Sequence, residues 1–109
     1  MTVQTLIDSL GLTVFHLEDP DRTVTGGYCG DLLSWVMGKA QENDAWLTIM
    51  SNVNVAAVAI LCDVACVILT EDVLPDEALL NKAKLQGVNL LGIPHSTLQA
   101  AAALSALLA

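Results

Sequence analysis

Basic residues are scarce in this 109-residue chain. Lysine and arginine together number 4 against 12 aspartates and glutamates, which gives a net charge of −8 at pH 7. Nucleic acids and anionic membrane surfaces are both bound through basic patches. The composition therefore excludes both kinds of partner. Arg22 is the single arginine, so few side chains are able to bind an anion.

Cysteine is also sparse, and no targeting segment stands out. The three cysteines, Cys29, Cys62 and Cys66, form no disulfide pattern, which is typical of free thiols in a reducing compartment. No base precedes Arg22, so we expect no secretory signal. The longest apolar run, 55–69, contains an aspartate and is too short to span a bilayer. We expect a cytoplasmic protein.

The common catalytic motifs are missing. Neither the Gly-x4-Gly-Lys-Ser/Thr phosphate loop nor the Gly-x-Gly-x-x-Gly dinucleotide motif occurs, which excludes a P-loop kinase. Cys62 and Cys66 lack a second ligand pair, so we expect no metal site. Cys29 precedes an expected helix, a position that can lower a thiol pKa, but no histidine adjoins it in sequence. We therefore expect neither an enzyme nor a resident cofactor.

What the chain does have is apolar residues. Hydrophobic residues make up 54% and charged residues only 15%, whereas an average domain is about 25% charged. The length suits one domain with one core. Because the apolar content exceeds what such a core needs, we expect part of the surface to be buried in a homodimer.

Strand and helix patterns alternate along the chain. Expected strands begin near 24, 45, 64 and 88, which is the spacing of βα units in a parallel sheet. We predict a single-domain α/β layered sandwich with a mainly parallel sheet built from repeated βα units. The expected strands are 12–17, 24–29, 45–50, 64–69 and 88–91, and the expected helices are 3–10, 31–40, 55–61, 75–86 and an alanine-rich helix after Ser96.

Ligands of parallel α/β sheets bind beyond the carboxyl ends of the strands. We predict a ligand site there, in which Arg22 neutralises an anion and nearby backbone and polar groups donate hydrogen bonds. The candidate residues are Arg22, Thr25, Gly26, Gly27, Asp31, Asn52, Asn54, His95 and Ser96.

Each candidate also has a structural interpretation. Asp31, Asn54 and Ser96 are well placed to cap helices, as is Ser51. Arg22 is close in sequence to Glu18, Asp19 and Asp21, and an ion pair with one of them would pin that acidic turn. A histidine at the position of His95 is more often an ordinary, partly exposed loop residue than a catalytic or ligand-binding one.

Several segments together resemble a known family, the DRTGG domain. They are Asp21-Arg22-Thr23, Thr25-Gly26-Gly27-Tyr28, Asp31-Leu32-Leu33-Ser34, Ala45-Trp46-Leu47-Thr48, Asn54–Ala59 and Pro75-Asp76-Glu77. The resemblance covers residues 3–105, so we expect 1–109 to form one DRTGG-like domain. Similar domains lie between CBS domains in regulated pyrophosphatases and ahead of the catalytic domain in long phosphotransacetylases. A related domain begins the HPr serine kinases.

The resemblance implies a regulatory module rather than a catalyst, and a homodimer. The resemblance is also compatible with an adenine nucleotide as the ligand. The chain departs from the expected pattern at Met50 and Asn52, where we expect glutamine and histidine, and this departure argues further against catalysis.

Our leading hypothesis is a homodimeric, non-catalytic domain that senses a small metabolite or nucleotide at the carboxyl edge, or binds a partner enzyme. The first alternative is a dimerisation or scaffold subunit with no ligand, whose apolar interface centres on Trp35. The second is a small phosphotransfer enzyme, which requires the side chain of His95 to meet Glu71 or Asp72.

Overall fold

The computed structural model describes residues 1–109 and contains one five-stranded sheet. The strand order is β1-β5-β4-β3-β2, in which β2 to β5 run parallel and β1 is antiparallel to β5. The strands are β1 (Thr13–His16), β2 (Gly26–Cys29), β3 (Asp44–Thr48), β4 (Cys66–Leu69) and β5 (Leu90–Gly92). The predicted α/β fold with a mainly parallel sheet is confirmed.

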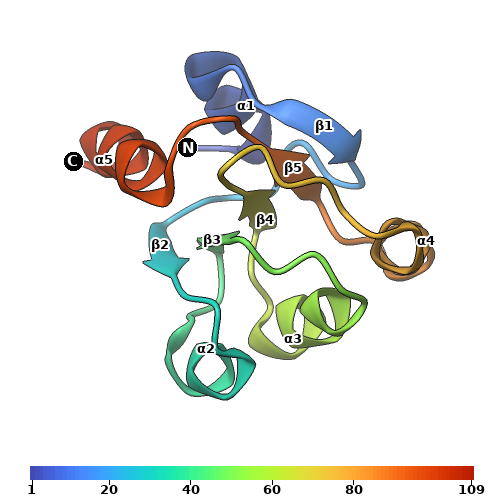
Figure 1. Ribbon diagram of the computed structural model, residues 1–109. Helices are drawn as coiled ribbons and strands as arrows, with labels where there is room; N and C mark the ends of the chain where they lie inside the picture. The colour runs from blue at the N-terminus through green and yellow to red at the C-terminus, as the bar shows by residue number, and fades with distance from the viewer.

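Helices cover both faces of this sheet (Figure 1). The helices α2 (Leu33–Lys39), α3 (Asn54–Cys62) and α4 (Glu77–Gln86) follow β2, β3 and β4 and share one face. The opposite face is covered by α1 (Val3–Leu10) and α5 (Thr97–Leu108). Crossovers between parallel strands have one hand, which places α2, α3 and α4 on the same side.

The two faces of the sheet bury two separate cores. Beneath α1 and α5, the core contains Leu6, Leu47, Ile68 and Leu104. Beneath the other three helices it contains Trp46, Val67 and Leu79, with Trp46 fully buried. Every residue of β3, β4 and β5 is buried, as is typical of parallel strands covered on both faces.

Local signals at several helix ends are confirmed. The Thr2 hydroxyl accepts a hydrogen bond from the Thr5 N–H, and Gly11 ends α1 in the left-handed conformation. Gly87 ends α4 in the same way. Ser96 forms a capping box with Gln99 at the start of α5. These ends depend on residues adjacent in sequence, which is why the sequence predicts them.

The start of α2 differs from the prediction. Asp31 does not cap this helix, which begins at Leu33 without a side-chain cap. The apolar residues of this helix do not all face the core, because Val36 is fully buried whereas Leu32 and Met37 are exposed. The short helix therefore leaves apolar side chains on the surface.

Candidate functional site

The carboxyl edge of the sheet gathers five of the candidate residues. Asp31 follows β2, Asn52 lies between β3 and α3, Asn54 begins α3, and His95 and Ser96 join β5 to α5. The βα connections thus bring residues from distant parts of the sequence to one edge, as predicted. Their ligand-binding role stays a prediction.

Most polar side chains at this edge already have partners within the chain. Asp31 Oδ1 accepts hydrogen bonds from the Thr48 hydroxyl at 2.8 Å and from the Ile49 N–H at 2.9 Å. Asn52 Oδ1 accepts from the Asn54 N–H at 3.0 Å. Asp31 joins the end of β2 to the end of β3, and Asn52 shapes the turn into α3.

Two other predicted caps behave differently. The Ser51 hydroxyl donates to Asp76 Oδ1 at 3.3 Å rather than capping α3. Asn54 is the first residue of α3 and its exposed side chain makes no capping bond. The capping roles predicted for Ser51 and Asn54 are therefore wrong, whereas that of Ser96 is confirmed.

His95 makes no catalytic pair. Glu71 and Asp72 have φ angles of 59° and 61° and form a tight turn, closed by a hydrogen bond from the Val73 N–H to the Thr70 carbonyl at 3.1 Å. The Glu71 N–H donates to the His95 carbonyl at 2.8 Å, but the exposed imidazole has no hydrogen bond or ion pair. The contact that phosphotransfer requires is not formed.

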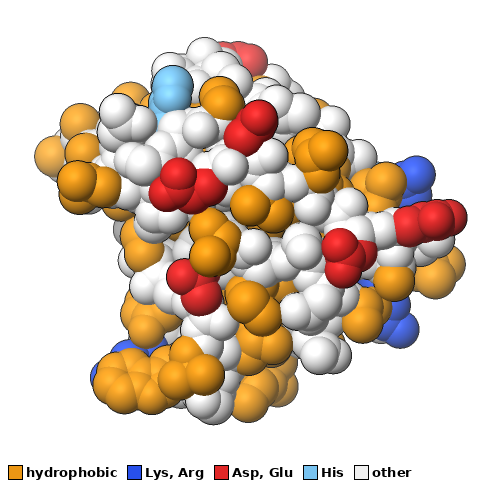
Figure 2. Space-filling model, in the orientation of Figure 1, with side chains coloured by type: hydrophobic (Ala, Val, Ile, Leu, Met, Phe, Trp, Pro, Cys, Tyr) orange, Lys and Arg blue, Asp and Glu red, His pale blue; other side chains and the backbone are white.

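The carboxyl edge is acidic. Asp31, Glu71, Asp72 and Asp76 lie along it, and no lysine or arginine follows any of the parallel strands there. Figure 2 shows acidic and hydrophobic side chains across the face turned to the viewer, with lysine and arginine only at its margins. No pocket opens at this edge. A polyphosphate would need a bound cation to approach it.

Arg22 lies at the opposite, amino edge of the sheet. It precedes β2, and its partners precede β3 and β4. Its Nε–H donates to Asn43 Oδ1 at 2.9 Å, and its Nη2 donates to the Asp63 carbonyl at 2.7 Å and to Asp63 Oδ1 at 3.0 Å. The predicted ion pair with Glu18, Asp19 or Asp21 is wrong, because the carboxylate that Arg22 meets belongs to Asp63.

Both partners of Arg22 stand at left-handed turns. Asn43 has φ 67° and Asp63 has φ 56°, a conformation that asparagine and aspartate tolerate better than most residues. One guanidinium therefore clamps the turn before β3 to the turn that ends α3. Arg22 cannot join Asn52 or His95 in one site while it makes these bonds.

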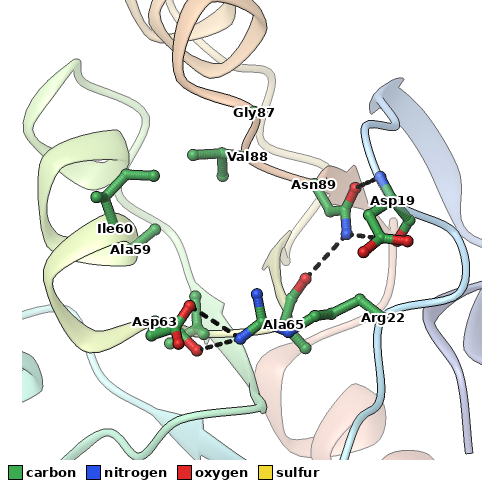
Figure 3. A pocket seen from close by; sticks show the side chains of 10 residues that line it. Asp19, Arg22, Ala59, Ile60, Asp63, Ala65, Gly87, Val88 and Asn89 are labelled. Atoms are coloured by element: carbon green, nitrogen blue, oxygen red, sulfur yellow. Dashed lines mark hydrogen bonds and ion pairs between the residues drawn. The ribbon is translucent and has the colours of Figure 1, made fainter.

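A small pocket adjoins this clamp (Figure 3). Arg22, Asp19 and Asp63 line its polar side, and Ile60 and Val88 line its apolar side. Its volume is about 60 Å³. Pockets that hold cofactors or drug-sized ligands measure about 300–1,000 Å³. The pocket is large enough for a few water molecules but not for a nucleotide.

Asn89 is a structural residue that sequence reasoning missed. This buried amide accepts from the N–H groups of Glu18 and Asp19 at 2.8 and 2.9 Å, and donates to the carbonyls of Asp19 and Ala65 at 3.0 Å each. It holds the acidic turn against the start of β4 (Figure 3). The sequence could have indicated this role, because Asn89 directly precedes the buried Leu90 and a buried amide requires hydrogen-bond partners.

Thr25, Gly26 and Gly27 do not form an anion-binding loop. The Thr25 N–H donates to the Asn43 carbonyl at 3.0 Å, and both glycines belong to β2. A Cβ on Gly26 would lie 2.7 Å from Asp44 Oδ1, and one on Gly27 would lie 2.7 Å from Leu104 Cδ2. The paired glycines let β3 and α5 pack closely against β2.

We expect Gly27→Ala to destabilise the fold and Gly38→Ala to stabilise it. The first adds a methyl group against Leu104, and such overpacking costs about 1–3 kcal/mol. The second adds a methyl group inside α2, where nothing lies within 4 Å, and removes a glycine penalty of about 0.5–1 kcal/mol. Urea unfolding measures the change in the free energy of unfolding for each variant. Two changes of the same sign would contradict this packing.

The cysteines are free thiols with raised pKa values. Burial, and then the neighbouring Asp31, raise the pKa of Cys29, so its position before a helix does not lower that pKa. Burial, and then Asp44, raise the pKa of Cys62. Burial raises the pKa of Cys66 to about 12, although Arg22 acts in the opposite direction. None of the three is activated as a nucleophile.

The Cys66 thiol makes the fold sensitive to alkaline pH. Between pH 9 and about 12 the unfolded chain loses a proton that the folded chain keeps. Stability therefore falls as pH rises in this window, by at most about 1.4 kcal/mol per pH unit for one group. We expect Cys66→Ala to have a flatter profile than the wild type in urea unfolding from about pH 8 to 11. If wild type and variant have parallel profiles, the Cys66 thiol has the same pKa in the folded and the unfolded chain, which would contradict this account.

No group of three or more histidine, cysteine, aspartate or glutamate side chains is arranged to hold a metal ion. None of the helices combines the length and the apolar character that crossing a bilayer would demand.

Comparisons with known proteins agree with this fold. Residues 32–107 match the sequence profile of the DRTGG domain. No curated protein sequence matches the chain. A crystal structure of the CBS and DRTGG domains of the regulatory region of Clostridium perfringens pyrophosphatase, complexed with the activator diadenosine tetraphosphate, is similar at a TM-score of 0.71 and 15% identity. The match covers 93% of this chain and 44% of that one.

This chain belongs to the DRTGG domain family, as the matched segment spans most of its length. The suspected family is thus confirmed. The matched segment begins after Arg22, Gly26 and Gly27, so it does not include the first two of the six segments that suggested the family. The chain spans less than half of the regulatory region that it resembles.

Proposed function

We propose that this chain is a non-catalytic regulatory domain that acts through association as a homodimer. The non-catalytic part of this proposal is supported by the carboxyl edge, which has neither a pocket nor an acid–base pair. Its side chains chiefly hold turns in place. Membership of the DRTGG family supports a regulatory role, and the apolar composition supports a dimer.

Light scattering across a concentration series tests the association. We expect a mass of twice 11.5 kDa at micromolar concentrations. A mass of 11.5 kDa throughout would contradict the proposal.

A second candidate function is the sensing of an adenine nucleotide. The similar pyrophosphatase region was crystallised with diadenosine tetraphosphate, which favours this candidate. Because the carboxyl edge is acidic, binding there would depend on a divalent cation. The exposed side chains of Asn54 and His95 have no partners within the chain and are free to contact a ligand.

Thermal unfolding with AMP, ATP and diadenosine tetraphosphate, each with and without Mg²⁺, tests the sensing function. A ligand at 100 times its Kd adds about 2.7 kcal/mol of stability. If the carboxyl edge is the site, the double variant Asn54→Ala, His95→Ala loses the shift, whereas Asp8→Asn on α1 keeps it. A panel without any shift would leave association as the function.

A further inference from the structure

We infer that the two copies meet through an apolar patch on the outer surface of α2 and α3. This inference rests on the homodimer proposed above and names its interface. The patch, here called the α2–α3 patch, consists of Leu32, Trp35, Met37, Val53 and Leu61. These side chains are between 38% and 68% exposed.

The two helices form one continuous surface. The Cys62 thiol lies 3.6 Å from the Val36 carbonyl and 4.0 Å from the Met37 carbonyl, which fixes the end of α3 beside α2. Figure 1 shows the two helices side by side along the lower rim of the molecule, and Figure 2 shows hydrophobic side chains gathered there. The layer of α2 and α3 buries its inner side on the sheet and leaves its outer side unpartnered.

The area of the patch suits a stable dimer. Trp35 is 59% exposed, so of the roughly 150–250 Å² that an aromatic side chain buries it presents on the order of 100 Å², and the aliphatic members of the patch are exposed to a similar degree. A stable interface buries about 800 Å² per partner. The patch forms the apolar centre of such an interface, and a polar rim around it adds to the buried area. On α5, the alternative face, Leu98 and Leu107 are the exposed large apolar residues, and the other exposed positions are small or polar.

The charge distribution around the patch suits a second copy of this chain as the partner. No aspartate or glutamate occurs in 32–41 or 45–62, although the chain carries 12 acids. Two copies of net charge −8 repel each other elsewhere, but this surface has no carboxylate to desolvate. Its one cation, Lys39, lies 5.2 Å from the centroid of the Trp35 ring. Asp31, Glu42 and Asp63 adjoin the uncharged stretches in sequence and can attract the Lys39 of the other copy.

Trp35 is expected to dominate the interface energy. Tryptophan is enriched among interface residues that contribute most to binding, and a half-exposed indole is costly to leave in water. Trp35 has no role in the core, because Trp46 fills the core beneath α2 and α3. Replacing Trp35 therefore affects association without affecting folding.

The test compares Trp35→Glu with a matched variant, Leu98→Glu, on α5. Both sites are exposed, so circular dichroism should show an intact fold in each case. In sedimentation equilibrium we expect Trp35→Glu to raise the dimer Kd at least about 100-fold and Leu98→Glu to leave it within about threefold of the wild type. A dimer that survives Trp35→Glu would overturn this interface while leaving the homodimer standing. A wild type that is monomeric would overturn both.

Discussion

Replacing Asn89 with alanine is expected to lower the free energy of unfolding by about 3–4 kcal/mol, because each buried polar group left without a partner costs about 1–3 kcal/mol. The four hydrogen bonds of this amide connect the acidic turn to β4, and the site is almost closed to water. Chemical denaturation with urea measures the loss. Few surface substitutions lower the free energy of unfolding by this much.

Two variants control for the loss of an amide in general. Asn54→Ala removes an exposed amide that caps nothing, so its effect should stay within about 0.5 kcal/mol. Asn89→Asp keeps the acceptor for the Glu18 and Asp19 N–H groups but places a carboxylate oxygen against two carbonyls. It should destabilise at least as much as alanine at neutral pH. A stable Asn89→Asp variant would mean that the donor half of the amide is dispensable.

Arg22→Ala is expected to destabilise the chain by about 2 kcal/mol. Its hydrogen bonds to Asn43 Oδ1 and the Asp63 carbonyl contribute about 1 kcal/mol each, whereas the partly exposed ion pair with Asp63 contributes little. The two turns are also joined directly, because the Asn43 N–H donates to the Asp63 carbonyl at 3.0 Å, and this bond remains in the variant. Urea unfolding is again the measurement.

Arg22→Lys separates the charge of Arg22 from its geometry. Lysine keeps the positive charge but cannot reach two acceptors with a planar fork, so it should recover at most about 0.5 kcal/mol. Full recovery would mean that charge alone matters. A nucleotide that binds to the carboxyl edge should keep its affinity in Arg22→Lys, since Arg22 lies at the other edge. Lost affinity would restore Arg22 to the ligand site.

Much of the fold was predictable because its signals are local or periodic. The recurrence of apolar strands predicted the parallel βα units, and Thr2, Gly11, Gly87 and Ser96 marked helix ends through their nearest neighbours. The antiparallel pairing of β1 with β5 was not predictable in this way. It joins residues from the two ends of the chain, and no turn connects them.

The candidate site was only partly predictable for the same reason. The order of the elements brings Asp31, Asn52 and His95 to one edge, as the βα rule predicts. Arg22 was placed at that edge on its sequence neighbours alone, whereas its partners lie 21 and 41 residues away. The exposure of Leu32 and Met37 could not be predicted, because periodicity does not distinguish an apolar face that packs on a core from one that lies on the surface.

The fluorescence of Trp35 on dilution tests the central claim, that this domain self-associates through the α2–α3 patch. Trp46 is fully buried and Trp35 is 59% exposed, so a change in emission on dilution reports Trp35. The Trp35→Phe variant keeps Trp46 as its one tryptophan, so it gives the background emission of Trp46, which should not change on dilution. We expect the wild-type emission maximum to move to longer wavelength as the dimer dissociates, with no such shift in the variant. An emission maximum that is constant from millimolar to nanomolar concentrations would contradict the claim.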